Sequence, residues 1–341
     1  MKIDVFNHVF PKAFFDRYIS KGGAGKDIGE RMTRVPIVVD LDYRFRVMDE
    51  FGDLRQVITL PQPPLETLGD PALSPVLAQM ANDGLAELVA RHPDRFIAFA
   101  ASLPLNNVDA CLAEIERSVD TLGAKGILLY TNVLGAPLDR PEFQPIFDEA
   151  VRRDIPIWLH PARDAKFADY ATEERSLYEI WWMLGWPYET SAAMARLVFS
   201  GLFDRHPTVK IITHHMGGML PYFEGRAGHG WDQLGVRTSD ADYGKLLRGM
   251  KKRPVDYFRE FYADTALFGA VAATRCGLDF FGIDRVLFAS DMPFDPTPGL
   301  FVRETIRVIE SLGLTADDKD RIYRRNAERL LKIGTPAAPP S

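Results

Sequence analysis

Eight short apolar runs, separated by stretches with a helical pattern, constrain the fold of this 341-residue chain more than any other feature. The runs cover residues 3–6, 56–60, 96–100, 126–130, 157–159, 211–213, 261–263 and 286–289. Between most of them, apolar residues recur at spacings of 3, 4 and 7, as in residues 108–119 and 143–151. Apolar strands that alternate with helices predict an α/β fold, a closed parallel (β/α)8 TIM barrel rather than an open sheet.

Two connections are longer than such a barrel requires. Residues 11–42, an insertion after the first strand, include a glycine-rich segment at 22–25, and we expect a loop that covers the mouth of the barrel. Residues 161–205, after the fifth strand, predict a helical insertion. It carries the aromatic residues Tyr178, Trp181, Trp182, Trp186 and Tyr188. Such a stripe is either buried or facing another subunit, or it forms a wall of the substrate pocket.

Capping signals mark two further helices and the end of the domain. Ser74 before Pro75 fits an N-cap followed by a proline in the first turn. Thr315 and Asp318 fit a capping box for a last helix that runs to about Leu331. We therefore expect a single barrel domain over residues 1–334 and a disordered tail over residues 335–341.

Composition excludes several classes of protein. Hydrophobic residues make up 46% and charged residues 26%, which is typical of a soluble globular domain, and the net charge of -6 gives no sign of a nucleic-acid partner. Two cysteines, Cys111 and Cys276, suit neither a disulfide framework nor a cysteine-based zinc site. With no signal peptide or membrane span in the sequence, we expect a cytoplasmic protein, and the aromatic insertion favours a homodimer.

Histidine and aspartate residues gather where the predicted strands end. His8, His160 and the pair His214–His215 each follow an apolar run, and so does Asp291. A histidine at one strand end is more often a hydrogen-bonded core residue than a ligand, and Asp291 could equally cap a turn. Chance is a poor explanation for several such strand ends together, because the carboxyl ends of barrel strands form the rim that carries active sites.

These side chains suit a catalytic metal. Neutral imidazoles and a carboxylate from different strands, with one open position, are typical ligands of Zn(II) or a similar ion. Strand alternation places Asp4, Phe6 and His8 on one face, with His8 nearest the rim. We expect His8, His160 and Asp291 to bind the metal. His215 would act as an acid or base, while alternation turns His214 the other way, into a structural role.

Six segments, in this order and spacing, carry a resemblance to a known family. They are residues 3–11 (IDVFNHVFP), 158–161 (WLHP), 186–190 (WPYET), 201–221 (GLFDRHPTVKIITHHMGGMLP), 288–294 (FASDMPF) and 326–330 (NAERL). With them the chain resembles the amidohydrolase superfamily, in the branch that contains aminocarboxymuconate-semialdehyde decarboxylase and the γ-resorcylate, dihydroxybenzoate and carboxyvanillate decarboxylases. The resemblance covers nearly the whole chain.

The resemblance implies roles for single residues. His8, His160 and Asp291 match metal ligands, and His215 matches the catalytic histidine of the His-x-Gly-Gly segment. We expect Asp291 to take part in catalysis as well. Arg44 matches an arginine that grips a substrate carboxylate, although it could as well be a solvated helix residue. We expect Trp186 and Phe294 to contact the substrate as well.

Phe6 departs from the family pattern. That pattern has His or Glu two residues before the histidine of the first strand, and Phe6 cannot bind a metal. Three protein ligands still suffice for a catalytic zinc, so we expect Zn(II), or alternatively Mn(II), held with lowered affinity.

The sequence thus predicts a carboxy-lyase: a metal-dependent, non-oxidative decarboxylase of a small aromatic or unsaturated carboxylic acid. Protonation of a ring or alkene carbon by His215 would create the electron sink that loss of carbon dioxide needs. One alternative is a hydrolase or hydratase that uses a metal-activated water on the same scaffold. Another is a ligand-binding protein that has lost catalysis, an alternative motivated by Phe6.

Overall fold

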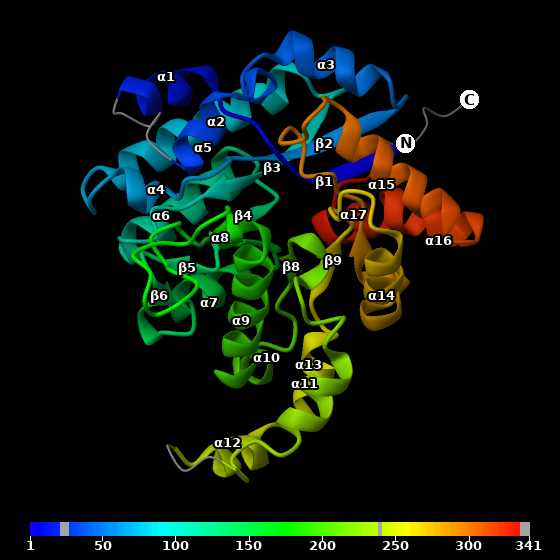
Figure 1. The fold of residues 1–341 in the computed structure, drawn as a ribbon. Coiled ribbons are helices and arrows are strands. Elements are labelled where there is room, and N and C mark those ends of the chain that lie inside the picture. Colours follow the sequence, from blue (N-terminus) through cyan, green and yellow to red (C-terminus); the bar gives the residue numbers. More distant parts are fainter. Residues whose placement is uncertain (21–26, 238–240, 335–341) are drawn as a thin grey trace.

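The eight predicted strands form one parallel sheet, in which each barrel strand pairs with the next barrel strand along the chain. The computed structural model describes residues 1–20, 27–237 and 241–334. The segment after the last strand bonds to the first strand. Phe288 O accepts the Val5 amide (3.0 Å), and the Asp291 amide donates to Phe6 O (3.0 Å). These bonds bring the end of the sheet back to the first strand, so the sheet forms a nearly closed barrel (Figure 1), as the sequence predicts.

The strands and helices alternate along most of the chain. The barrel strands are β1 (Lys2–His8), β2 (Leu54–Thr59), β3 (Phe96–Ser102), β4 (Gly126–Tyr130), β7 (Ile157–His160), β8 (Ile211–Thr213), β9 (Tyr262–Asp264) and β10 (Val286–Leu287), and a hairpin outside the barrel joins β5 (Asn132–Val133) and β6 (Ala136–Pro137). The helices are α1 (Lys12–Ser20), α2 (Ile28–Thr33), α3 (Leu41–Asp49), α4 (Leu65–Leu68), α5 (Ser74–Arg91), α6 (Val108–Glu116), α7 (Gln144–Arg152), α8 (Ile180–Met183), α9 (Gly185–Phe199), α10 (Leu202–Arg205), α11 (Glu224–Trp231), α12 (Tyr243–Gly249), α13 (Pro254–Phe258), α14 (Val271–Phe281), α15 (Leu300–Ser311), α16 (Ala316–Asp320) and α17 (Asn326–Leu331).

Apolar side chains fill the barrel and also pack between its strands and helices. The interior cluster includes Val57, Leu128, Trp158 and Leu287, all at most 2% exposed. Trp158 spans the interior, and its indole Nε1 donates to Val5 O on β1 (2.7 Å). Because the strands are covered on both faces, they are apolar throughout rather than alternating, which is why the sequence shows continuous runs.

A bulge in β1 corrects one expectation from strand alternation. The register of β1 against β2 shifts between Asp4 and Asn7. Phe6 packs in the barrel interior, whereas Asp4 contacts Ser290 Oγ (2.6 Å) on the other face of the strand. Asp4 therefore does not share a face with Phe6 and His8, since a bulge adds one residue to the strand and reverses the alternation beyond it.

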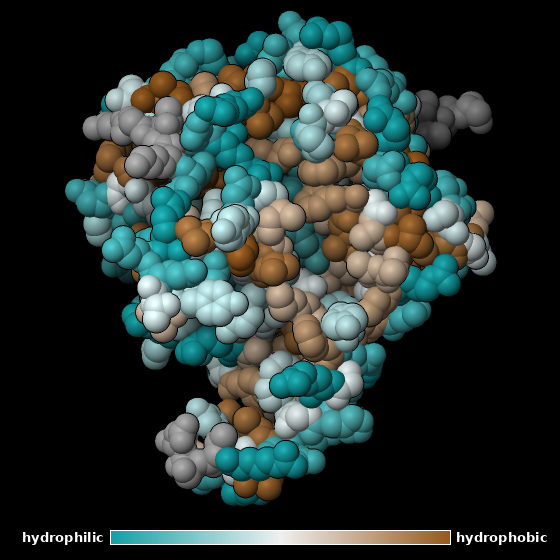
Figure 2. All heavy atoms as spheres, viewed as in Figure 1, coloured by the Kyte–Doolittle hydropathy of each residue, from teal (hydrophilic) through white to brown (hydrophobic). Residues whose placement is uncertain are grey.

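The two insertions meet each other. The first contains α1 and α2 where we expected a loop, and the glycine-rich residues 22–25 lie outside the described residues. Ile28 of α2 packs on a small cluster formed by Ala165, Trp181 and Trp186. The guanidinium of Arg31 also lies over the ring of Trp182, 4.1 Å from its centroid. Hydrophobic residues gather at the centre of the face in Figure 2, in the region between α9 and α14 (Figure 1).

The helix signals are mostly confirmed. Thr315 caps α16 by accepting the Asp318 amide (3.1 Å), and α17 ends at Leu331. α5 begins at Ser74, but Ser74 is not its cap, because its hydroxyl bonds Asn106 Oδ1 (2.5 Å). The predicted tail, 335–341, lies outside the described residues. Among the helices of the described segments, none has the length and apolarity to cross a bilayer.

Candidate metal centre

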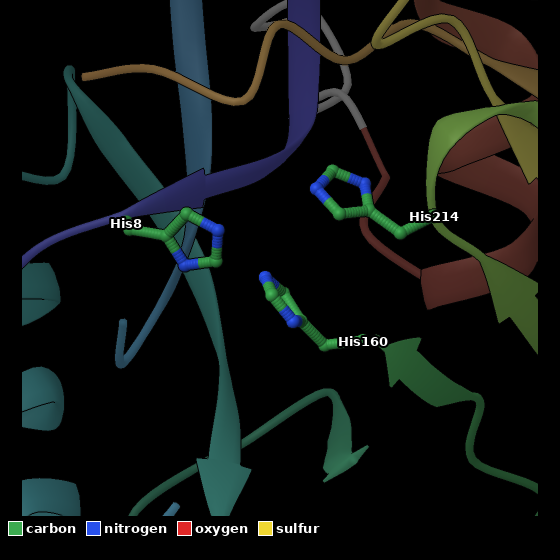
Figure 3. A group of neighbouring side chains, drawn as sticks. All are labelled: His8, His160 and His214. Carbon is green, nitrogen blue, oxygen red and sulfur yellow. The ribbon is translucent and has the colours of Figure 1, made fainter. Parts of the chain in front are cut away.

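Three histidines from three parts of the barrel point toward one another (Figure 3). His8 is the last residue of β1, His160 is the last residue of β7, and His214 follows β8. Each offers a ring nitrogen, and these nitrogens lie within 4.8 Å of one another. All three side chains are buried, so the cluster is a converging set of donors with little water around it.

Hydrogen bonds fix the proton of two of these rings on Nδ1. The Thr59 hydroxyl donates to Asn7 O (2.8 Å), so its oxygen is left to accept Nδ1–H of His8 (2.9 Å). His160 Nδ1 lies 2.7 Å from Pro161 O, a carbonyl that can only accept. In both rings, Nε2 therefore keeps its lone pair and faces the centre, which is the arrangement that orients a metal-binding imidazole.

His214 overturns the expectation that it points away. Its Nδ1 lies 2.5 Å from Asp264 Oδ2 and its Nε2 lies 3.3 Å from Asp291 Oδ1. His214 and Ile212 share the interior face because inward residues on β8 are the even-numbered ones, and Ile212 belongs to the interior cluster. Burial opposes the protonation of His214, but Asp264 and Asp291 outweigh it and raise its pKa to about 9.

Asp291 lies between two of the histidines. It has a positive φ of 62°, which turns the chain sharply after β10. Its Oδ1 is 3.3 Å from Nε2 of His8 and 3.3 Å from Nε2 of His214. Burial opposes ionisation of this carboxyl, but its contacts with His214 and His8 hold its pKa well below the usual range. Asp291 is thus an ionised carboxylate inside the cluster.

His215 lies on the outer side of the same group. Its ring stacks on His214 with centroids 3.7 Å apart, and its Nδ1 lies 2.7 Å from Ala266 O, which fixes the proton there. His214, His215 and Asp291 also offer donors within 4.8 Å of one another. Burial, followed by the charge of His214, lowers the pKa of His215 to about 4. His215 is partly exposed and offers a neutral Nε2.

Two of the three expected substrate contacts lie beside the cluster. The Trp186 ring is 5.7 Å from the His160 ring, and the Phe294 ring is 5.4 Å from the His8 ring. Arg44 is elsewhere: it is fully buried, and its guanidinium donates to Asn7 Oδ1 (2.7 Å), His8 O (2.7 Å) and Gln56 Oε1 (2.8 Å). The hydrogen bonds of Arg44 therefore lie behind β1, on the face away from the histidine rings.

Sequence reasoning missed His214, Asp264 and Thr59. His214 was visible as half of a histidine pair, but the pair did not reveal which ring turns inward. Asp264 ends β9, so it carried the same strand-end signal as Asp291 and was overlooked. Thr59 gave no signal, because a buried threonine at a strand end is common.

The donor set fits a divalent metal. His8 Nε2 is buried and has no hydrogen-bond partner among the described residues, which is costly unless something binds it. Imidazole nitrogens with a carboxylate suit zinc or a similar transition metal. A (β/α)8 barrel with these donors at the carboxyl ends of its strands has the architecture of a metal-dependent barrel enzyme.

Comparison with known proteins identifies the family of this barrel. Residues 3–333 match the amidohydrolase family model. The chain belongs to the amidohydrolase family. It is 33% identical over 306 residues to the γ-resorcylate decarboxylase of Rhizobium radiobacter, an alignment that covers 86% of this chain and 87% of that protein.

Solved structures give the same picture. A 2,6-dihydroxybenzoate decarboxylase complexed with 2,6-dihydroxybenzoate is 28% identical, with a TM-score of 0.77, and the match covers 97% of this chain and 98% of that one. A 5-carboxyvanillate decarboxylase from Novosphingobium aromaticivorans, complexed with manganese and 4-hydroxy-3-methoxy-5-nitrobenzoic acid, is 26% identical. Its TM-score is 0.81, with 98% and 96% of the two chains covered. The resemblance seen in the sequence is confirmed.

Proposed function

We propose that this protein is a metal-dependent, non-oxidative decarboxylase of a small aromatic or unsaturated carboxylic acid. The observation that carries the proposal is the convergence of two lone-pair nitrogens, His8 Nε2 and His160 Nε2, with Asp291 Oδ1 3.3 Å from the first of them. The similarity of the chain to aromatic-acid decarboxylases supports the same reaction class.

His8, His160 and Asp291 would hold the metal. When bound, the ion supplies positive charge that anchors the substrate carboxylate and a neighbouring oxygen. Zn(II) suits the nitrogen donors, and Mn(II) is the alternative because the similar carboxyvanillate decarboxylase was solved with manganese.

His215 moves the proton in this proposal. Loss of carbon dioxide leaves an electron pair on carbon, so a proton must reach the carbon that carries the carboxylate before that bond breaks. Burial lowers the pKa of His215 to about 4, so its ring is neutral, and with Nδ1–H held by Ala266 O its Nε2 carries the lone pair. It therefore takes up a proton first, for which a substrate hydroxyl is a source, and then delivers it to carbon. The carbon–carbon bond then breaks, and its electrons restore the conjugated system.

Aromatic side chains would form the substrate pocket. Trp186 lies next to His160 and Phe294 next to His8, so a flat ring held at the cluster meets an apolar surface on two sides. We do not assign Arg44 to the substrate, because each of its three guanidinium nitrogens already donates to β1 or to Gln56. It positions the backbone of His8 instead. A homodimer in the cytoplasm remains our expectation from the sequence.

A direct test is to incubate the protein with Mn(II) or Zn(II) and a panel of hydroxybenzoates and muconate-type acids, and to measure carbon dioxide. We expect release from at least one ortho-hydroxylated acid. A hydrolase or hydratase on this scaffold would instead incorporate oxygen from ¹⁸O-labelled water. Tight binding of an acid without turnover and without metal would favour a non-catalytic homologue and contradict the proposal.

A further inference from the structure

We infer that His214 supplies the metal ligand that β1 lacks, so that one ligand of this site has moved from the first strand to the end of β8. The inference rests on the metal site of the proposed function. Phe6 occupies the position where the sequence resemblance led us to expect a ligand, and it has no donor atom. His214 fills the same region from the end of β8, with its ring nearly parallel to that of Phe6 and 3.8 Å away.

The orientation of His214 is built rather than incidental. Asp264 Oδ1 accepts the backbone amides of His215 and Ala266, each at 3.0 Å, which fixes the carboxylate. Its Oδ2 then holds Nδ1 of His214 at 2.5 Å. A carboxylate bonded to one nitrogen of a histidine is the usual support for a metal on the other nitrogen.

Two aromatic rings clamp the imidazole. Phe6 stacks on one side of His214, with planes 15° apart, and His215 stacks on it at 25°. Both faces of the ring and its Nδ1 edge are therefore occupied. Nε2 is left pointing at His8 and His160 (Figure 3).

The spacing of the donor atoms fits a metal better than a hydrogen bond. Asp291 Oδ1 lies 3.3 Å from Nε2 of His8 and 3.3 Å from Nε2 of His214, which is long for a bond to a charged acceptor. Ligands at about 2.0–2.1 Å from a tetrahedral zinc stand roughly 3.3 Å apart. His214 thus joins His8 and His160 in one group of ring nitrogens within 4.8 Å of one another, and Asp291 contacts two of the three. Phe6 is the platform under the His214 imidazole.

The experiment compares wild-type protein with His214→Ala, Phe6→His and the double variant Phe6→His/His214→Ala. Each is stripped of metal and titrated with Zn(II), and then with Co(II), whose absorption spectrum reports the ligand set. We expect His214→Ala to weaken binding at least ~100-fold, more than the loss of a supporting residue does. The double variant should recover most of that loss, because a histidine returns to β1. His92→Ala, a histidine outside the cluster, is the matched control and should bind as wild type does.

A variant that keeps the ring guards against misfolding. Asp264→Asn retains an oxygen for the two amides but no longer offers a carboxylate to Nδ1–H, so the ring loses the support that directs Nε2 into the site. We expect weaker metal binding with an unchanged circular dichroism spectrum. Unaltered Zn(II) affinity in His214→Ala, or a double variant that binds no better than the single one, would overturn the inference.

The outcomes also separate this inference from the proposed reaction. A wild-type protein that binds metal through His214 but releases no carbon dioxide from any acid would refute the decarboxylase and leave the ligand assignment intact. A protein that releases carbon dioxide while His214→Ala keeps its metal would do the reverse.

Discussion

The ring of Phe6 lies almost flat against the ring of His214, with centroids 3.8 Å apart and planes at 15°. Both side chains are fully buried, and they come from parts of the barrel that are not neighbours in the sheet. A phenylalanine that replaces a ligand would leave a gap in a metal site, but here it is the surface on which another histidine rests. The departure of this chain from the family pattern in β1 therefore coincides with a compensating residue after β8.

His215→Asn should leave metal content and melting temperature close to wild type but lower the turnover number by roughly two to four orders of magnitude, the usual contribution of an acid–base residue. His206→Asn, which alters a histidine paired with Asp148 on the surface, is the matched control. Steady-state carbon dioxide release measures both. A His215→Asn protein with more than a tenth of wild-type turnover would show that the proton comes from elsewhere.

Asp291→Asn should strip metal from the purified protein, because an amide is a far weaker ligand than a carboxylate. If Asp291 only caps a turn, the cost would be about 1 kcal/mol of stability with unchanged metal content. Elemental analysis beside a thermal melt distinguishes the two. Asp295→Asn, four residues further on, should keep its metal.

Thr59→Val should weaken metal binding by about 10- to 100-fold, although Thr59 touches no metal. Its hydroxyl accepts Nδ1–H of His8, and without it the ring loses both its orientation and its fixed proton. Thr274→Val removes an equally buried hydroxyl, on α14, and serves as the control. The idea fails if the two variants bind Zn(II) with equal affinity.

Arg44→Lys should lower the free energy of unfolding by about 2–4 kcal/mol, since lysine keeps the charge but cannot serve three acceptors in fixed directions. Urea unfolding measures the loss, and Arg46→Lys, an exposed position on the same helix, should cost little. A normal stability combined with a raised KM would mean that Arg44 grips the substrate after all.

The buried carboxyl of Glu66 should make the stability of the folded protein depend on pH. Its carboxyl is buried, and neither oxygen has a hydrogen-bond partner in the described part of the chain. Burial raises its pKa from 4.5 to about 7. The folded state therefore binds this proton more tightly than the unfolded state does. The resulting stability is complete below about pH 4.5 and is lost as the pH rises to about 7, a change on the order of 3 kcal/mol.

Glu66→Gln should flatten that part of the profile, because the amide has no proton to lose. Chemical denaturation between pH 5 and about 8 compares it with wild type, and the exposed Glu87→Gln should change nothing. A wild-type protein that gained stability relative to Glu66→Gln as the pH rose would contradict the predicted sign of the pH dependence. Glu66 would then have an ionic partner in the folded state.

The sequence by itself determined the barrel and the location of its site. Strands buried on both faces must be apolar throughout, so eight runs could be counted along the chain, and parallel strands deliver their carboxyl ends to one rim. His8, His160 and Asp291 were therefore found as strand-end residues, and the structure brings His8 and His160 together with Asp291 beside His8.

Only the tertiary structure decided which face each rim residue presents. The bulge in β1 separates Asp4 from Phe6, and the position of β8 turns His214 inward, because one residue of register reverses every side chain beyond it. Arg44 was readable as a charged helix residue, but its fully buried partners on β1 and β2 lie 12 to 37 residues away. Contacts at that separation depend on how strands and helices pack, and no local pattern in the chain records them.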